Sequence, residues 1–239
     1  MTIEPLGDSA LIVRVVDEFA RDSEASLSAV LETFRSLEAA SIPGVIELAP
    51  AYTTVAVFFD PTQVAPDETG QPPFDWLRSE IESVLKTRST RSANQESKSE
   101  STAIEVPVCY DGEFAPDLTE VARHTRLSEE EVVRRHSSAS YRVHCVGFTP
   151  GFPFLGGLPS ELATPRRATP RKEIPAGAVG IGGTQTGIYP RKSPGGWNLI
   201  GRTPLRLFDV LRNPPALFQA GDHVRFQKIS REEFNAFSR

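Results

Sequence analysis

The stretch Tyr141–Pro204 decides the fold, and it reads YRVHCVGFTPGFPFLGGLPSELATPRRATPRKEIPAGAVGIGGTQTGIYPRKSPGGWNLIGRTP. Between Gly147 and Gly201 it holds twelve of the seventeen glycines, and nine of the twenty prolines lie between Pro150 and Pro204. Glycine permits positive φ and close backbone approach, whereas proline fixes φ and removes a hydrogen-bond donor. A long helix is therefore excluded. We expect short strands joined by shaped loops, where binding and catalytic groups tend to lie.

The same region is strongly basic. From Pro165 to Arg206 there are eight basic residues and one acidic residue, Glu173, which makes a net charge of +7 in a chain whose net charge is −5. A local positive field attracts anions, so the cluster predicts an anionic-ligand site; a solvated basic face is the alternative. The eight residues are Arg166, Arg167, Arg171, Lys172, Arg191, Lys192, Arg202 and Arg206.

Three motifs in this region resemble those of one bacterial family. They are GFTPGFPFLGGLP at 147–159, PRRATPRKEIPAGAVGIGGTQTGIYP at 165–190 and SPGGWNLIGRTP at 193–204. The family is the B subunit of ATP-dependent 5-oxoprolinase, also called the first subunit of allophanate hydrolase or the KipI family. It is similar to part of the carboxyltransferase domain of urea carboxylase. The resemblance extends over nearly the whole chain and implies a cyclophilin-like barrel in the second domain, without implying prolyl isomerase activity.

The resemblance also implies a function that this chain does not perform alone. It implies joint action with an A subunit and a carboxyltransferase-like C subunit to open 5-oxo-L-proline to L-glutamate with ATP hydrolysis. ATP, with its Mg²⁺, would be shared with a partner, and the sequence has no biotin-attachment segment. Two alternatives stay open: a KipI-like inhibitor that docks on a sensor histidine kinase, and a carboxyltransferase component of a urea carboxylase or allophanate hydrolase system.

Composition sets the broad class of the protein. The chain has 239 residues, of which 39% are hydrophobic and 24% charged, as is ordinary for a soluble globular protein. It contains no apolar run long enough for a membrane helix, and its first residues do not form a signal peptide. Two cysteines argue against a disulfide framework and favour the cytoplasm. The acidic balance disfavours a general nucleic-acid binder.

Residues 1–88 predict an α+β domain in the order β-β-α-β-β-α. A hairpin is expected around Gly7-Asp8, and a turn at Pro50 between two strands. The predicted strands are Ile3–Leu6, Ala10–Val15, Val45–Leu48 and Thr53–Phe59, and the predicted amphipathic helices are Ser23–Ala40 and Phe74–Lys86.

Residues 89–102 are polar and rich in Ser, Lys and Glu, which predicts a flexible linker. A mostly β, cyclophilin-like barrel domain is expected at 103–239, with strands at Ile104–Tyr110, Leu205–Phe208 and His223–Ile229. Asp117 and Ser128 match the capping-box pattern and predict two short helices, 118–125 and 129–137. Glu129–Glu131 would repel phosphates, which disfavours a DNA-binding helix-turn-helix.

The candidate site residues lie in the glycine-rich and basic motifs. No phosphate-binding P-loop is present, and Gln185 stands where a dinucleotide motif needs its last glycine. Gly182–Thr186 predict either an anion-binding nest of backbone amides or a tight hairpin. Arg171 and Arg202 are the candidate catalytic cations, since an arginine fork suits carboxylate or phosphate. The candidate substrate or anion-binding residues are Arg166, Gly182, Gly183, Thr184, Gln185, Thr186, Tyr189, Ser193 and Trp197.

Histidine supplies the third catalytic candidate. His144 directly precedes GFTPGFPFLGG, and its ordinary pKa lies near neutrality, so it is the candidate general acid or base; a satisfied core histidine is the alternative. His124 and His136 lie on predicted surface helices and have no expected role. His144 and Cys145 are strand neighbours that face opposite sides, and the four histidines lie too far apart in sequence to form a ligand set, so no metal site is predicted.

Overall fold

The computed structural model describes residues 1–17, 23–64, 70–89 and 102–237. The chain divides into two compact units, Met1–Glu100 and Ser101–Arg239. This division falls within the predicted linker, whose residues 90–101 lie outside the described residues. Within the described ranges, every helix falls short of the length and apolarity that crossing a membrane requires.

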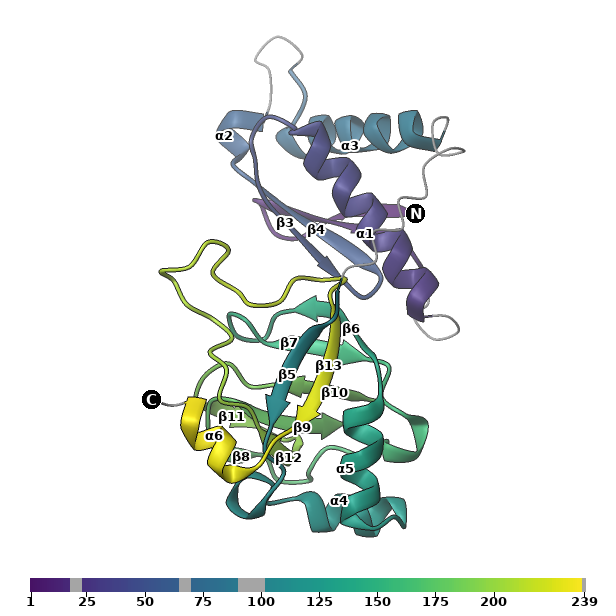
Figure 1. Cartoon of the computed structure of the whole chain (residues 1–239). Helices are drawn as coiled ribbons and strands as arrows, with labels where there is room; N and C mark the ends of the chain where they lie inside the picture. Colours follow the sequence, from purple (N-terminus) through teal and green to yellow (C-terminus); the bar gives the residue numbers. More distant parts are fainter. Residues whose placement is uncertain (18–22, 65–69, 90–101, 238–239) are drawn as a thin grey trace. The chain divides into compact units, whose positions relative to one another are not determined.

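The first unit contains a four-stranded antiparallel sheet in the order β1-β2-β4-β3, with helices α1 and α3 over one face (Figure 1). Its core consists of alternate residues of β2 and β4 against the apolar faces of α1 and α3. The elements follow the predicted order, with one short helix added. They are β1 (Thr2–Pro5), β2 (Ala10–Arg14), α1 (Ser23–Ala40), β3 (Val45–Ala51), β4 (Thr54–Phe59), α2 (Pro61–Val64) and α3 (Pro73–Ser89).

The predicted turn at Pro50 is wrong. Pro50 lies inside β3, where it pairs with Val55 of β4. The chain reverses two residues later, at Tyr52, whose φ is +47°. The fixed φ of proline is compatible with extended backbone, so Pro50 extends the strand instead of ending it.

The second unit is a mostly antiparallel sheet with helices packed against it (Figure 1). Its elements are β5 (Ile104–Val108), a 3₁₀ turn (Gly112–Phe114), α4 (Leu118–Thr125), α5 (Glu129–Ser138), β6 (Tyr141–Val146), β7 (Pro153–Gly156), a second 3₁₀ turn (Ser160–Leu162), β8 (Arg171–Ile174), β9 (Ala178–Gly182), β10 (Gln185–Ile188), β11 (Ser193–Gly195), β12 (Asn198–Arg202), β13 (His223–Lys228) and α6 (Arg231–Phe237). The two helices predicted at 118–125 and 129–137 are thus confirmed.

The sheet of the second unit is not a closed barrel, which corrects the prediction. The strands run β6-β7-β10-β9-β12, while β13 pairs antiparallel with β6 and parallel with β5, and β8 and β11 form a separate ribbon. Within residues 102–237, the two ends meet at one isolated bridge, between Cys109 and Arg202, with both N···O distances at 2.9 Å. Because β5 ends at Val108 and the chain then enters the 3₁₀ turn, the described strands form no ladder that closes the ring.

The strand predicted at Leu205–Phe208 is also absent from the structure. Phe208 makes one isolated bridge, to Ala216. The chain turns directly afterwards, where the Asp209 carboxylate accepts a hydrogen bond from the Leu211 amide at 3.0 Å. The alternating pattern reflects one buried residue, Leu207, in an irregular segment.

Candidate active site

Several strand glycines of the second unit make room for large rings. A Cβ on Gly182 would lie 2.6 Å from the Trp197 ring, and one on Gly187 would lie 2.8 Å from the Pro153 carbonyl oxygen and 3.0 Å from the Phe152 ring. A Cβ on Gly195 would overlap the Tyr189 hydroxyl in the same way. Contacts this short do not occur for real side chains, so these glycines are required where the rings pack on the backbone.

The rings seated on these glycines form a rigid wall. Phe152 lies edge-to-face against Tyr189 and Trp197, with centroid distances of 5.1 and 5.6 Å. Phe154 lies 5.9 Å from Trp197. Edge-to-face pairs are favourable beyond the area they bury, so each ring helps to hold the next in place. Burial raises the pKa of the Tyr189 phenol.

A cavity of about 220 Å³, which we call the aromatic hollow, opens on this wall. The Arg166 guanidinium lies over the Trp197 ring at 5.8 Å from its centroid, within the range of a cation–π contact. The hollow is lined by Phe148, Phe152, Phe154, Arg166, Arg167, Pro170, Tyr189, Gly195, Gly196 and Trp197. It thus brings together three predicted site residues, Arg166, Tyr189 and Trp197.

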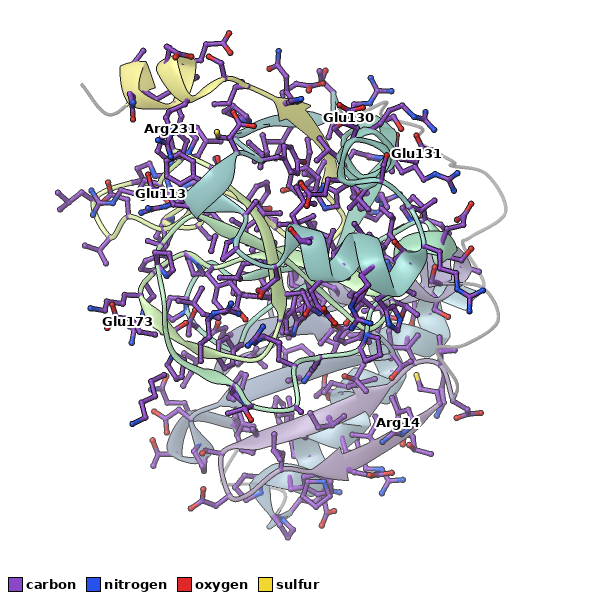
Figure 2. The ribbon with its side chains drawn as sticks, turned by 90° about the horizontal axis from the view of Figure 1, so that it is seen from below. Arg14, Glu113, Glu130, Glu131, Glu173 and Arg231 are labelled. Carbon is purple, nitrogen blue, oxygen red and sulfur yellow. The ribbon has the colours of Figure 1, made fainter. Side chains whose placement is uncertain are left out.

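A second cavity, which we call the Arg202 hollow, has a volume of about 320 Å³. The Arg202 Nε donates to the Ala176 carbonyl oxygen at 2.9 Å, and its guanidinium lies 5.9 Å from the Phe114 ring centroid. Two carboxylates share this hollow: Glu113, which pairs with Arg231 at 2.7 Å, and Glu173, which lies apart from that pair (Figure 2). The lining is Glu113, Phe114, Pro116, Arg171, Glu173, Pro175, Ala178, Leu199 and Arg202.

Asp117 connects the two hollows, a role that the sequence analysis did not predict. It was expected to cap α4, but its side chain makes no cap hydrogen bond. Instead its carboxylate accepts hydrogen bonds from Arg167 at 2.8 Å, from both terminal nitrogens of Arg171 at 2.8 Å, and from the Leu199 amide at 2.7 Å. The side chain is only 4% exposed. The carboxylate therefore bonds to two guanidinium groups and a strand amide instead of to the free backbone amides at the start of α4.

The ion pairs with Asp117 give two of the basic residues, Arg167 and Arg171, a structural role. Arg167 lines the aromatic hollow and Arg171 lines the Arg202 hollow, and one carboxylate holds both. Arg171, a predicted catalytic cation, thus has a buried acidic partner. Arg166 and Arg202 have no acidic partner within the described parts of the chain, so they are the better candidates for contact with an anion.

His144 lines neither hollow. It lies in β6 at a register shift between Val143 and Cys145 and is 1% exposed. Its ring packs directly on Gly156, whose hydrogen occupies the space that a Cβ would take. Burial also raises the pKa of the neighbouring Cys145 thiol. The structure therefore places His144 in the core, outside the lining of both hollows.

The predicted anion-binding segment 182–186 forms a two-residue hairpin between β9 and β10, in which Gly182 pairs with Gln185. The Gly183 amide donates to the Thr164 carbonyl at 2.8 Å, and Thr184 is exposed at the tip. Neither these residues nor Ser193, which is buried in β11, line the two hollows. In the described ranges, no group of three His, Cys, Asp or Glu side chains is placed to hold a metal ion.

His136 was missed, because it was assigned to a surface helix. It is fully buried, with Nδ1 at 2.9 Å from the Tyr110 hydroxyl and Nε2 at 3.0 Å from Thr186 Oγ1. Thr186 donates its own proton to the Gly180 carbonyl, so it accepts from Nε2–H, and Nδ1 accepts from Tyr110. A signal was available: Val132, Val133 and His136 share one face of α5, and the two valines are apolar.

Gly182→Ala is expected to destabilise the second unit by about 1–3 kcal/mol, because the added methyl overlaps the Trp197 ring. Urea unfolding monitored by circular dichroism measures the loss, and near-ultraviolet dichroism reports the displaced ring. Thr184→Ala, at the exposed tip of the same hairpin, is the matched control. An unchanged unfolding midpoint for Gly182→Ala would show that the strand does not need this glycine.

Comparison with known proteins identifies the family. Residues 1–218 match the family described as carboxyltransferase domain, subdomain C and D. The chain is 42% identical to the B subunit of 5-oxoprolinase from Bacillus subtilis (strain 168) over 238 residues, which cover 98% of this chain and 95% of that protein.

Solved structures extend the comparison to the fold. The crystal structure of TTHA0988 superposes with a TM-score of 0.73 at 34% identity and covers 92% of this chain, which spans only 39% of the TTHA0988 chain. Kluyveromyces lactis urea carboxylase, at 19% identity and a TM-score of 0.68, shares the fold over 98% of this chain and 22% of its own. The chain therefore belongs to the carboxyltransferase-domain subdomain C and D family, together with the B subunit of 5-oxoprolinase.

Proposed function

We propose that this protein is the B subunit of an ATP-dependent 5-oxoprolinase, a hydrolase that opens 5-oxo-L-proline to L-glutamate. The observation that carries the proposal is the 42% identity to the Bacillus subtilis B subunit, which extends over nearly the full length of both chains. The two free cysteines support a reducing compartment, and we assign the protein to the cytoplasm.

The protein acts, in this proposal, only with partner A and C subunits. The relative's name, which makes it one lettered component of 5-oxoprolinase, supports this assignment. So does TTHA0988, in which the fold of this chain accounts for 39% of a longer polypeptide. The remaining part of such a polypeptide corresponds, in our proposal, to a carboxyltransferase-like partner that is a separate chain here.

The geometry supports a contribution of positive charge to the reaction. A lactam carbonyl is a poor electrophile, and bound ATP would supply a phosphoryl group to activate it. Arg202 presents a guanidinium at its hollow without an acidic partner among the described residues, and it can stabilise developing negative charge. Arg166 can do the same at the aromatic hollow.

Among the described residues, those that line the two hollows do not by themselves fit a whole nucleotide. Arg167 and Arg171 are engaged by Asp117, which leaves one available guanidinium in each hollow. A triphosphate with its Mg²⁺ needs several such donors together. We therefore propose that the partner subunits supply most of the contacts to ATP and its metal ion.

Turnover by the assembled complex tests the proposal. Glutamate and ADP release from 5-oxo-L-proline and ATP should require this chain, and Arg202→Ala should lower kcat by at least about tenfold. Arg191→Ala, an exposed arginine that lines neither hollow, is the matched control and should keep full activity. An assembled complex without turnover would contradict the proposal and direct attention to histidine-kinase inhibition.

A further inference from the structure

The aromatic hollow has a lining that selects the charge of its ligand. Its walls are five aromatic rings, and among the described residues its only charged lining groups are Arg166 and Arg167. An aromatic cage for a cation usually relies on ring faces and tolerates no competing positive charge. Two arginines at the cavity therefore exclude a cationic ligand and favour an anion with a compact apolar body.

The volume of the hollow limits the size of that anion. Pockets for drug-sized ligands measure about 300–1,000 Å³. The aromatic hollow, at about 220 Å³, is smaller than this range. It suits a single small ring with its substituents and excludes an entire nucleoside triphosphate.

The two arginines differ in what they offer a ligand. Arg167 uses one terminal nitrogen for Asp117, and its buried Nε has no acceptor within the described ranges. Arg166 is exposed and is oriented by the Trp197 face instead of by a carboxylate. A guanidinium held in this way keeps its hydrogen-bond donors for a planar carboxylate.

Phe148 adds a ring at the mouth of the hollow. Its side chain is 65% exposed and its φ is +69°, a conformation that residues other than glycine rarely adopt. The adjacent backbone holds it there, since the Thr149 amide donates to the Gly147 carbonyl at 2.8 Å and the Phe152 amide to the Thr149 carbonyl at 3.0 Å. Strained residues of this kind gather at ligand sites, and this one lines a cavity.

We propose that the aromatic hollow binds a small cyclic carboxylate. The carboxylate lies on Arg166, with Arg167 beside it, and the ring packs against Trp197 and Tyr189, with Phe148 at the mouth. The chemical class of the ligand follows from the residues that line the aromatic hollow and from its volume. The choice of 5-oxo-L-proline, a five-membered lactam with one carboxylate, as the probe rests on the proposed function.

Tryptophan fluorescence can test this directly. The chain has two tryptophans, so a Trp76→Phe background leaves Trp197 as its only tryptophan, and the same complex with Trp197→Phe added gives the fluorescence of the partner subunits to be subtracted. In this background, 5-oxo-L-proline is titrated into the full chain alone and into the assembled complex. We expect a saturable change in at least one of the two, and Arg166→Gln should weaken binding by about tenfold or more, the usual size of a charged hydrogen bond.

Matched variants and ligand analogues separate this site from general charge attraction. Arg191→Gln removes the same charge from an exposed position outside the hollow and should leave the affinity unchanged. Phe148→Ala should weaken binding by about threefold or more, because the ring of the ligand loses its apolar contact with the Phe148 side chain. Cyclopentanecarboxylate should compete with 5-oxo-L-proline, whereas 2-pyrrolidinone, which lacks the carboxylate, should not.

The outcomes of these experiments test the binding site in the aromatic hollow separately from the proposed 5-oxoprolinase function. Equal weakening by Arg166→Gln and Arg191→Gln would overturn the site, as would turnover by a complex in which 5-oxo-L-proline leaves Trp197 unchanged. A Trp197 signal that assembly alone shifts and that no longer responds to ligand would overturn it too, and would assign the hollow to a partner side chain. Specific binding by a complex without turnover would uphold the site and overturn the proposed function.

Discussion

Asp117→Ala is expected to lower the free energy of unfolding by at least about 2 kcal/mol, less than the full cost of breaking a buried ion pair, because the Arg167 and Arg171 side chains are 34% and 26% exposed. Its carboxylate is the acceptor for two guanidinium groups and for the Leu199 amide. Without it, Arg167 and Arg171 face each other with no anion between them, and the amide loses its side-chain acceptor. The residue therefore matters for stability although it lies directly before a short helix, at its N-cap position.

Urea unfolding at neutral pH measures this loss. Glu120→Ala is the matched control, because Glu120 also pairs with an arginine, Arg123, but on the exposed surface of α4. Exposed pairs contribute at most about 1 kcal/mol, so the control should be nearly neutral. Asp117→Asn, which keeps the shape and loses the charge, should fall between the two. Equal losses in the free energy of unfolding for Asp117→Ala and Glu120→Ala would show that the buried carboxylate stabilises the fold no more than an exposed one.

Acidification is expected to destabilise the second unit through His136, before most carboxylates titrate. Burial lowers the pKa of His136 from its ordinary 6.5 to about 3 in the folded protein. Between these two values the unfolded chain binds a proton at this residue and the folded chain does not. The stability that His136 contributes is therefore complete above pH 6.5 and is lost as the pH falls toward 3, by roughly 1.4 kcal/mol per unit.

Urea unfolding at pH 7 and pH 5 isolates this effect. His136→Gln cannot take up the proton, so its stability should fall by about 2 kcal/mol less than that of the natural chain over this interval. His124→Gln removes an exposed histidine and should keep the slope of the natural chain. If His136→Gln also keeps that slope, the ring is already protonated in the folded state, and the hydrogen bond from Nε2 to Thr186 would be its remaining role.

The interval between pH 7 and pH 5 also lies above the range in which Glu131 titrates. Glu131, whose pKa the guanidinium groups of Arg134 and Arg135 lower to about 2, titrates well below it. Its contribution to stability is present above pH 4.5 and is lost only as the pH falls toward 2. A loss of stability above pH 5 is therefore not due to the Glu131 ion pairs.

Local patterns in the sequence predicted the local structure well. The apolar spacing in Ser23–Ala40 predicted α1 with both ends correct, and Ser128 accepts the capping hydrogen bond from the Glu131 amide at 3.1 Å, as the motif indicates. The density of glycine and proline after Tyr141 predicted short strands and loops. These features depend on interactions between residues a few positions apart, which a single sequence displays directly.

The roles of particular polar residues were predicted less well. Asp117 carries a capping pattern, yet its partners Arg167 and Arg171 lie 50 and 54 residues away in the chain. His136 looked like a surface residue, yet it bonds to Thr186 across 50 residues. A short motif cannot show that distant groups compete for a side chain, so the stronger long-range partners were not visible.

The sequence by itself therefore determined the family, the helices α1, α3, α4 and α5, the first hairpin, and the basic, glycine-rich region in which candidate ligand contacts lie. Only the tertiary structure decided which of the eight basic residues are committed to Asp117 and which face a cavity. It also showed that Gly182, Gly187 and Gly195 are seats for rings, because a missing Cβ matters only where another side chain occupies its place. Pairing across the sheet brings those side chains together, and that pairing links residues far apart in the chain.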